Sequence, residues 1–304
     1  MDSFTAGMLV EHASLGPGKV IAAKGDMLHV FFPSRNGHAA TRIKLDPKRP
    51  LLRPAARQSD PWLDHLPPFV LKDGTYQLAH ERLTQPQAIG HFKQVFPLGF
   101  NDPAYEGNLQ TGERHYKVAA HKAFNEAFGG GKAEQLLAEG KVAELTHRLL
   151  HIDAKTNLLH PNWDKAPLRD GLKDEQAAER FHRTLFALLA LPEPTQSAFE
   201  DFVGALDALP APGSAVATWP VTTVFLYLAQ PDRHMFFRPK YTQEAAQRLG
   251  YELNYAPHPN WRTYSSLHGF SRLLLEELKP LGARDFIDVQ SFIYVTAGGS
   301  GYDK

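Results

Sequence analysis

Short apolar runs, rich in β-branched and aromatic residues, occur between Gly7 and Leu45, and glycine, proline and asparagine separate them. This pattern predicts strands joined by turns. The expected strands are Met8–Glu11, Lys19–Lys24, Leu28–Phe32 and Ala40–Leu45, with turns at 16–18, 25–26 and 36–37. Because a sheet this small must curl on itself to build a core, we expect a small β-barrel over residues 1–50.

A proline-rich segment follows the expected barrel. Six prolines occur within residues 46–74, and such a density disfavours helices and central strands. We therefore expect a linker over residues 51–74. Its apolar residues, among them Leu51, Trp62, Leu63 and Phe69, indicate that it packs along a domain surface.

From residue 75 to residue 304 the apolar period changes to about 3.6, which predicts a mainly α-helical domain. The expected helices are Pro86–Val95, Arg114–Phe128, Lys132–His151, Ala177–Leu191, Ser197–Leu209, Pro220–Leu228, Thr242–Leu249, Tyr264–Leu281 and Asp285–Thr296. Local signals support several ends: Pro220 suits a first helical turn, Thr242 can cap a helix, and the glycines at 129–131 end one.

Three motifs stand in order within the first fifty residues. Gly7-Met8-Leu9-Val10-Glu11-His12 is followed by Leu15-Gly16-Pro17-Gly18-Lys19-Val20-Ile21 and then by Gly25-Asp26-Met27-Leu28-His29-Val30-Phe31-Phe32. Gly16 and Gly18 would supply a tight turn and a close backbone approach, and Leu28, Val30 and Phe32 would fill a core.

This order of motifs resembles the Tudor-like barrel at the C-terminus of UvrD/PcrA-type helicases and, more distantly, the RNA-polymerase-interacting domain of CarD. The resemblance implies an SH3/Tudor-like barrel that docks on a protein such as RNA polymerase, or on nucleic acid, and has no active site. An insertion at 33–38 departs from the pattern, and the phosphate-binding motif of a helicase motor is absent. The rest of the chain resembles uncharacterised bacterial proteins. The expected fold class is α+β, an SH3/Tudor-like barrel followed by a larger, mainly α-helical domain.

Composition restricts the chemistry. The chain has 304 residues, no cysteine and a formal net charge of zero. The missing thiols exclude disulfides and thiolate metal sites and fit a cytoplasmic location. A signal peptide is not expected, since residues 1–7 lack a basic start and an apolar run. A membrane span is not expected either, since the longest apolar run, Val221–Ala229, is too short. Charge is uneven: residues 1–60 hold nine Lys and Arg against five Asp and Glu, which makes this part polyanion-friendly.

Two groups of cations are the predicted contacts for nucleic acid or a protein partner. They are Lys19, Lys24, Arg35, Arg42, Lys44, Lys48 and Arg49 near the N-terminus, and Arg233, His234, Arg238 and Lys240 in the helical domain. The second group is interleaved with Phe236, Phe237 and Tyr241, on which bases could stack. The alternative is a loop between two helices whose aromatic residues belong to the core.

Metal chemistry has two candidates. His147 and His151 stand at i and i+4, a metal-ligand spacing, with Asp153 and His160 nearby, although chance also produces such spacings among 15 histidines. Asp232 followed by Glu277 and Lys279 has the order of a metal-dependent nuclease, although a solvated helix face is the better account of the last two. We assign no metal ligand and no cofactor.

Two further patterns each allow two interpretations. Asp285 and Asp288 could form a carboxylate pair for acid/base work, or Asp285 could cap the last helix. Arg114, Lys117 and His121, spaced i, i+3 and i+7, could present cations to phosphates, or they could form a solvated face with Tyr116 and Ala120 turned inward.

The function favoured by the sequence is a non-catalytic binding or adaptor protein that docks on nucleic acid or on the transcription and repair machinery through its N-terminal barrel. The alternative is a metal-dependent nuclease or hydrolase with its site in the helical domain, for instance in a defence or repair system. A purely structural partner-binding protein is the third hypothesis.

Overall fold

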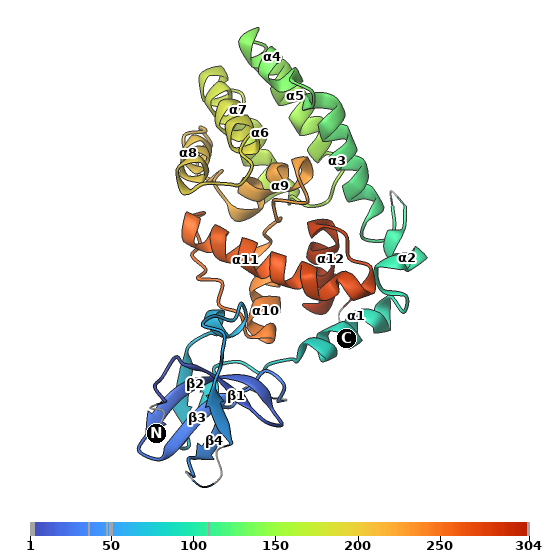
Figure 1. Cartoon of the computed structure of the whole chain (residues 1–304). Helices are drawn as coiled ribbons and strands as arrows, with labels where there is room; N and C mark the ends of the chain where they lie inside the picture. The colour runs from blue at the N-terminus through green and yellow to red at the C-terminus, as the bar shows by residue number, and fades with distance from the viewer. Residues whose placement is uncertain (1–3, 36, 47, 49–50, 109, 303–304) are drawn as a thin grey trace. The chain divides into compact units, whose positions relative to one another are not determined.

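The chain folds into a small sheet near its N-terminus and helices over most of the remainder, so the fold class is α+β (Figure 1). This computed structural model describes residues 4–35, 37–46, 48, 51–108 and 110–302. The chain divides into two compact units. The sheet unit comprises the chain up to His91 together with Gln243–Glu252, and the helical unit comprises Phe92–Thr242 together with the chain from Leu253 onward.

The sheet unit is built from antiparallel strands. They are β1 (Leu9–His12), β2 (Gly16–Lys24), β3 (Met27–Phe31), β4 (Thr41–Lys44), β5 (Leu52–Pro54), β6 (Phe69–Lys72) and β7 (Thr75–Leu78), with a short 3-10 helix η1 (Leu63–His65). One five-stranded sheet has the order β4-β3-β2-β1-β5, and β6 pairs with β7 in a separate hairpin. The expected strands each overlap an observed strand, so this part of the prediction is confirmed.

Apolar side chains cover both faces of the five-stranded sheet. Leu28 and Val30 of β3 belong to one buried cluster, to which each of the other four strands of the sheet also contributes a residue. On the opposite face Leu9 and Phe31 contact Leu63 and Leu78, which come from η1 and β7. Because side chains alternate along a strand, the same short sequence serves two clusters.

Gly16 and Gly18 have the roles that the sequence predicts. Gly16 has φ of +71° at the turn between β1 and β2, a conformation that favours glycine. A Cβ atom on Gly18 would lie 2.6 Å from the Phe32 ring and 2.8 Å from the Phe31 carbonyl oxygen. Any larger residue at position 18 would therefore displace the strand beside it.

The sheet extends beyond the expected limit at residue 50, which is a correction. Strand β5 comes from the proline-rich segment and pairs with β1, with Leu52 opposite His12 and Pro54 opposite Val10. Proline is tolerated there because β5 lies at the edge of the sheet. The expectation that the segment packs along a surface holds for Leu63, which is buried, whereas Leu51 is exposed.

The hairpin of β6 and β7 was not predicted. Asp73 and Gly74 connect the two strands with φ of +50° and +73°, the left-handed conformation that a tight hairpin turn requires. An Asp-Gly pair between apolar residues was the signal that could have revealed it. The hairpin supplies Tyr76 to the candidate site.

A distant part of the chain completes the sheet unit. The ring of Tyr251 stacks on His65 at a centroid distance of 4.9 Å and an interplanar angle of 8°. The Glu252 N–H donates to the His65 carbonyl oxygen at 2.7 Å. Sequence periodicity contains no information on such a contact between distant segments.

The helices follow the sheet in a long series. They are α1 (Gln85–Val95), α2 (Pro103–Glu106), α3 (His115–Phe128), α4 (Lys132–Ala138), α5 (Val142–Asp153), α6 (Ala166–Gly171), α7 (Glu175–Leu189), α8 (Gln196–Asp207), α9 (Trp219–Ala229), α10 (Pro239–Leu249), α11 (Trp261–Leu278) and α12 (Phe286–Thr296). Short 3-10 turns lie at Gly99–Asn101 and Lys279–Leu281, and a π-helical turn lies at Pro161–Lys165.

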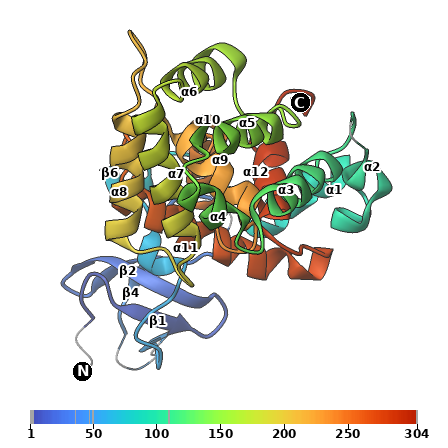
Figure 2. The same ribbon diagram turned by 90° about the horizontal axis from the view of Figure 1, so that it is seen from above.

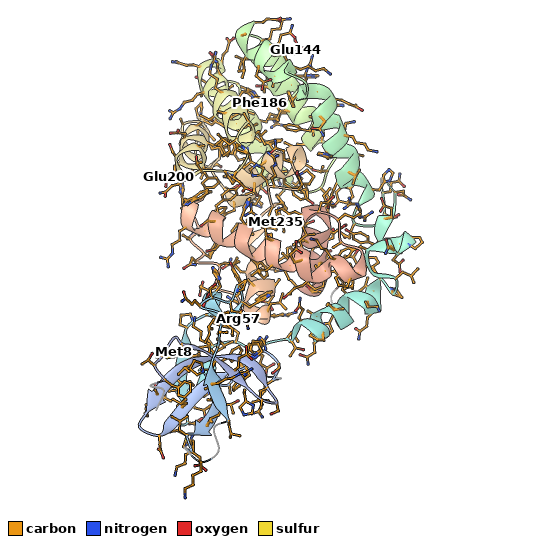
Figure 3. All side chains as sticks on the ribbon, viewed as in Figure 1. Met8, Arg57, Glu144, Phe186, Glu200 and Met235 are labelled. Atoms are coloured by element: carbon orange, nitrogen blue, oxygen red, sulfur yellow. The ribbon has the colours of Figure 1, made fainter. Side chains whose placement is uncertain are left out.

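Helices α9 and α12 form the interior of the helical unit. Nearly all of their residues are buried, and most of these residues are apolar, so each helix is covered around its whole circumference. Helix α9 contacts α3 and α7 and lies among the helices of its unit in both views (Figures 1 and 2). Side chains follow this layering: Met235 is buried inside the unit, whereas Glu200 is exposed on its outside (Figure 3).

The expected helices are confirmed in position, with two corrections. The expected helix 132–151 is two helices, because Gly140 adopts φ of +67° between them. Helix α10 begins at Pro239, so Thr242 is not its cap. Pro220 occupies the first turn of α9, and Gly129 caps the end of α3, both as predicted.

Candidate functional site

Lys24, Arg42 and Lys44 lie on one face of the five-stranded sheet, and we call this set the cationic face. Met27 on β3 pairs with Lys24 on one side and with Lys44 on the other. Two residues further along, His29 pairs with Arg42. Because alternate residues of a strand share a face, the three cations project from the same side of the sheet.

An imidazole and a phenol ring lie among these cations. His29 is buried, and its ring centroid is 4.9 Å from that of Tyr76 in an edge-on arrangement. The Lys24 Nζ atom is 5.5 Å from the Tyr76 ring centroid. Burial lowers the pKa of His29, and the charges of Arg42 and Lys24 lower it further. The imidazole is therefore neutral at neutral pH, and the positive charge belongs to the side chains around it.

The charge of the cationic face is only partly neutralised. Lys44 forms an ion pair with Asp26 at 3.5 Å, but both side chains are mostly exposed, so the pair contributes little. Within the residues that the structure describes, neither Lys24 nor Arg42 has a carboxylate oxygen within 4.0 Å. Exposed cations without a partner are the groups that contact phosphate oxygens.

The other predicted N-terminal cations serve different purposes. Lys19 is a correction: its ammonium donates to the Leu63 carbonyl oxygen at 2.8 Å and lies 3.7 Å from Asp64, so it fastens η1 to the sheet. Arg35 donates to the Thr41 hydroxyl at 3.1 Å in an exposed loop. Lys48 is exposed, and Arg49 lies outside the described residues.

The aromatic residues of the second predicted group belong to the core of the helical unit. Phe236 and Phe237 are buried, so their faces are not open to bases. His234 is also buried, with its Nδ1 2.6 Å from the Tyr264 hydroxyl, and burial lowers its pKa to about 3. His234 is therefore a neutral core residue and not a cation, because this segment passes through the interior after α9.

The remaining cations of that group each contact different residues. Arg233 lies 3.7 Å from Asp232, and Lys240 stands 5.3 Å from the ring centroid of Tyr241. Arg238 donates from Nη1 to the Leu158 carbonyl oxygen at 2.9 Å and also lines a pocket. The arrangement does not form the predicted stacking platform.

The predicted metal and nuclease residues are not assembled. His147 and His151 are exposed on α5, whereas Asp153 is buried and pairs with Lys165 at 3.1 Å. His160 accepts hydrogen bonds at the start of the π-helical turn. In the described part of the chain there is no group of three His, Asp or Glu residues that could hold a metal ion.

The nuclease candidates are engaged elsewhere. Asp232 pairs with Arg233, and the Lys279 ammonium lies 2.6 Å from Glu276. Glu277 lies on α11, but its side chain is half-buried, so only Lys279 fits the solvated-helix interpretation. Their order in the sequence therefore does not correspond to a common site.

Asp285 and Asp288 belong to a buried network. Asp285 caps α12 by accepting from two backbone N–H groups, as predicted. Arg114 donates to both carboxylates at 2.8 Å, and the Tyr105 hydroxyl donates to Asp288 at 2.5 Å. These contacts join the start of α3 to α12. Asp285 and Asp288 therefore have a structural role in holding the two helices together.

Lys117 is fully buried, and the predicted cationic helix face is therefore wrong. Its ammonium donates to Glu113 at 3.1 Å, Gln290 at 2.6 Å and Ser291 at 3.0 Å. Burial lowers the pKa of Lys117, and the charge of Glu113 partly opposes that shift. His121 also turns inward, with Nδ1 2.8 Å from the Leu228 carbonyl oxygen. Lys117 therefore holds α3 in place and does not face solvent.

Of the two residues expected to turn inward, Ala120 is buried and Tyr116 is half-buried. Gln290 is the residue of this region that the sequence did not reveal. It accepts a hydrogen bond from Lys117 because α12 lies beside α3 in the folded chain. Such a contact has no local sequence signal.

Comparison with known proteins found no match for the chain. No family model matches it, and neither the curated proteins nor the solved structures yield a match. No described helix is both long enough and apolar enough to span a lipid bilayer.

Proposed function

We propose that this protein is a non-catalytic docking protein that binds nucleic acid through the cationic face of its sheet unit. The observation that carries the proposal is the convergence of Lys24 and Arg42 around His29 and Tyr76, without a neutralising carboxylate among the described residues. Cations on a firm sheet contact phosphates, and a neighbouring aromatic ring provides a surface for a base.

The order of the strands is a second observation that supports the proposal. An antiparallel sheet with the order β4-β3-β2-β1-β5 is compatible with closure into an SH3/Tudor-like barrel, the fold that the N-terminal motifs resemble. Barrels of this type serve many ligands, so the fold does not choose the partner. The choice of nucleic acid rests on the charge of the exposed side chains, and a protein of the transcription or repair machinery is the competing occupant.

Fluorescence anisotropy tests the proposal with the full chain and short labelled DNA and RNA strands in about 50 mM salt, where phosphate contacts are stronger than at physiological salt. The Lys24→Gln/Arg42→Gln double variant should weaken binding about tenfold or more, since each contact is charge-assisted. The matched control removes two exposed cations of the helical unit, Arg183→Gln/Arg272→Gln. It should bind as the unaltered chain does.

Three outcomes are informative. Binding that the double variant loses and the control keeps supports the proposal. Absence of binding to every strand refutes it, and capture of purified RNA polymerase by the same face would then favour the competing occupant. Cleavage of the strands that requires Mg²⁺ or Mn²⁺ would favour the nuclease hypothesis instead.

A further inference from the structure

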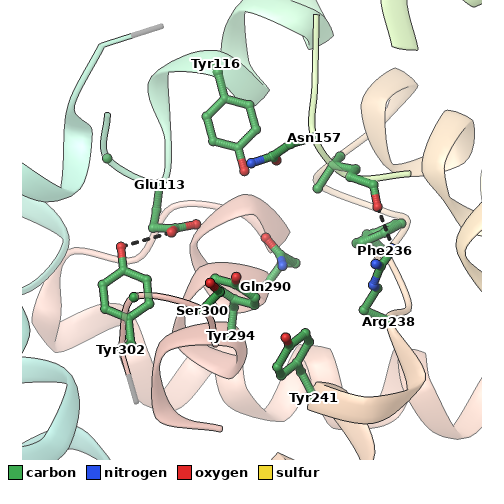
Figure 4. Close-up of a pocket in the computed structure, with 13 residues that line it drawn as sticks. Glu113, Tyr116, Asn157, Phe236, Arg238, Tyr241, Gln290, Tyr294, Ser300 and Tyr302 are labelled. Carbon is green, nitrogen blue, oxygen red and sulfur yellow. Dashed lines mark hydrogen bonds between the residues drawn. The ribbon is translucent and has the colours of Figure 1, made fainter. Parts of the chain in front are cut away.

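The helical unit contains a pocket of about 350 Å³ that the proposed docking role does not use. Its lining comes from α3 and the residues just before it, α10, α12, the segments after α5 and α9, and the chain near residue 300. Tyrosine rings, amide groups and one guanidinium surround it (Figure 4). A volume of this size falls in the range of roughly 300–1,000 Å³ that small-molecule sites occupy.

Buried charges fix the floor of the pocket. The Lys117 ammonium donates to Glu113 Oε2 and to Gln290 Oε1. The other oxygen of Glu113 accepts from the Tyr302 hydroxyl at 3.0 Å. Both carboxylate oxygens of Glu113 therefore accept hydrogen bonds, and the charges of Lys117 and Glu113 neutralise each other. Because the Gln290 oxygen is taken, its NH₂ group is what this side chain offers to a ligand.

Aromatic rings form the walls. Tyr241 meets Tyr294 at a centroid distance of 4.9 Å and an angle of 76°, and Tyr294 meets Tyr302 at 6.0 Å and 89°. Tyr116 lies on the opposite side of the pocket from Tyr241 (Figure 4). Edge-to-face contacts hold the rings in position, so aromatic surface is available to a planar ligand without rearrangement.

One cation stands at the side of the pocket. Arg238 uses Nη1 for the Leu158 carbonyl oxygen and for Asp164 at a longer 3.5 Å. The side chain remains 34% exposed. Guanidinium carries five N–H donors, so these two contacts leave capacity for an anionic group.

We propose that this pocket binds a small molecule that combines a planar ring with one anionic group. The ring would lie between the tyrosines, Gln290 would donate to an acceptor on it, and Arg238 would pair with the anion. A nucleoside monophosphate and an aromatic carboxylate both supply this chemistry, and the experiment separates them. The inference is independent of the docking proposal because no residue of the sheet unit lines the pocket.

Isothermal titration calorimetry of the full chain tests the inference with four nucleoside monophosphates, the matching nucleosides, inorganic phosphate and a set of aromatic carboxylates. Removal of the charge in Arg238→Gln should weaken binding about tenfold or more. Loss of the ring in Tyr241→Ala should weaken it about fivefold or more. Circular dichroism confirms that each variant is folded.

Matched controls lie on the surface of the same unit. Arg272→Gln and Tyr255→Ala remove an exposed cation and a partly exposed ring outside the pocket and should leave affinity unchanged. Binding of either ligand class with this pattern supports the inference and identifies the source.

Failure of both classes to bind at millimolar concentration overturns the inference. Binding that ignores both pocket variants, or binding of phosphate alone with equal affinity, overturns it as well. The Lys24→Gln/Arg42→Gln variant separates the two proposals, since it should keep the pocket ligand while losing nucleic acid.

Discussion

His182 makes the stability of the helical unit depend on pH. It lies on α7 with no exposed surface, and its Nε2 is 2.9 Å from the Thr146 hydroxyl. Burial lowers its pKa from 6.5 to about 4, and no charged neighbour contributes to the shift. The folded protein therefore keeps this imidazole neutral under conditions where the unfolded chain protonates it.

The sign and size follow from proton linkage. The unfolded chain binds the extra proton below its pKa of 6.5, so the contribution of His182 to stability is complete above that pH and is lost as the pH falls toward 4. From neutral pH to about pH 5 the difference in proton uptake corresponds to about 2 kcal/mol of unfolding free energy, at 1.36 kcal/mol per pKa unit. At about pH 4 the loss reaches about 3 kcal/mol.

Urea unfolding followed by far-ultraviolet circular dichroism measures this loss. Other groups also titrate, so the useful quantity is the difference between the unaltered chain and His182→Gln. The variant should show a pH dependence that is weaker by about 2 kcal/mol between neutral pH and about pH 5. His115→Gln, on the exposed side of α3, is the control and should leave the curve unchanged. Parallel curves for His182→Gln and the unaltered chain would refute the reasoning.

Two substitutions test the packing directly. Gly18→Ala should lower the free energy of unfolding by about 1–3 kcal/mol, because its Cβ would lie 2.6 Å from the Phe32 ring. Gly90→Ala has open space around it and should have no cost; equal effects in urea titrations would contradict the model of the β2–β3 contact. Lys117→Met should cost about 3–5 kcal/mol because it leaves the Glu113 carboxylate poorly paired, whereas Lys122→Met on the exposed side of α3 should be nearly neutral. A Lys117 variant as stable as the Lys122 variant would show that the buried network contributes nothing.

Local sequence patterns predicted most of the strands and helices. The alternation at Leu28 and Val30 and the helical period around α3, α7 and α11 depend on neighbouring residues only, so they are readable from the chain. Gly140, which splits an expected helix, also left a local signal, since glycine disfavours helix interiors and often ends helices. The Asp73-Gly74 turn left one as well.

The sites were less readable because they depend on tertiary contacts. Lys117 looks like a surface cation on its helix until Gln290 and Glu113 are brought around it. His234 looks like a cation until burial makes it neutral. Lys24 and Arg42 are exposed, as the proposed contacts require, but the sequence could not separate Lys19 from them, because η1 covers it through a carbonyl oxygen distant in sequence.

The docking proposal predicts how affinity depends on salt. A plot of log K against log salt concentration for a single-stranded DNA should have a negative slope for the unaltered chain. For the Lys24→Gln/Arg42→Gln variant the slope should be shallower by about 1.4, which corresponds to two lost phosphate contacts at about 0.7 each. Equal slopes for the two proteins would contradict the claim that this face of the sheet holds nucleic acid.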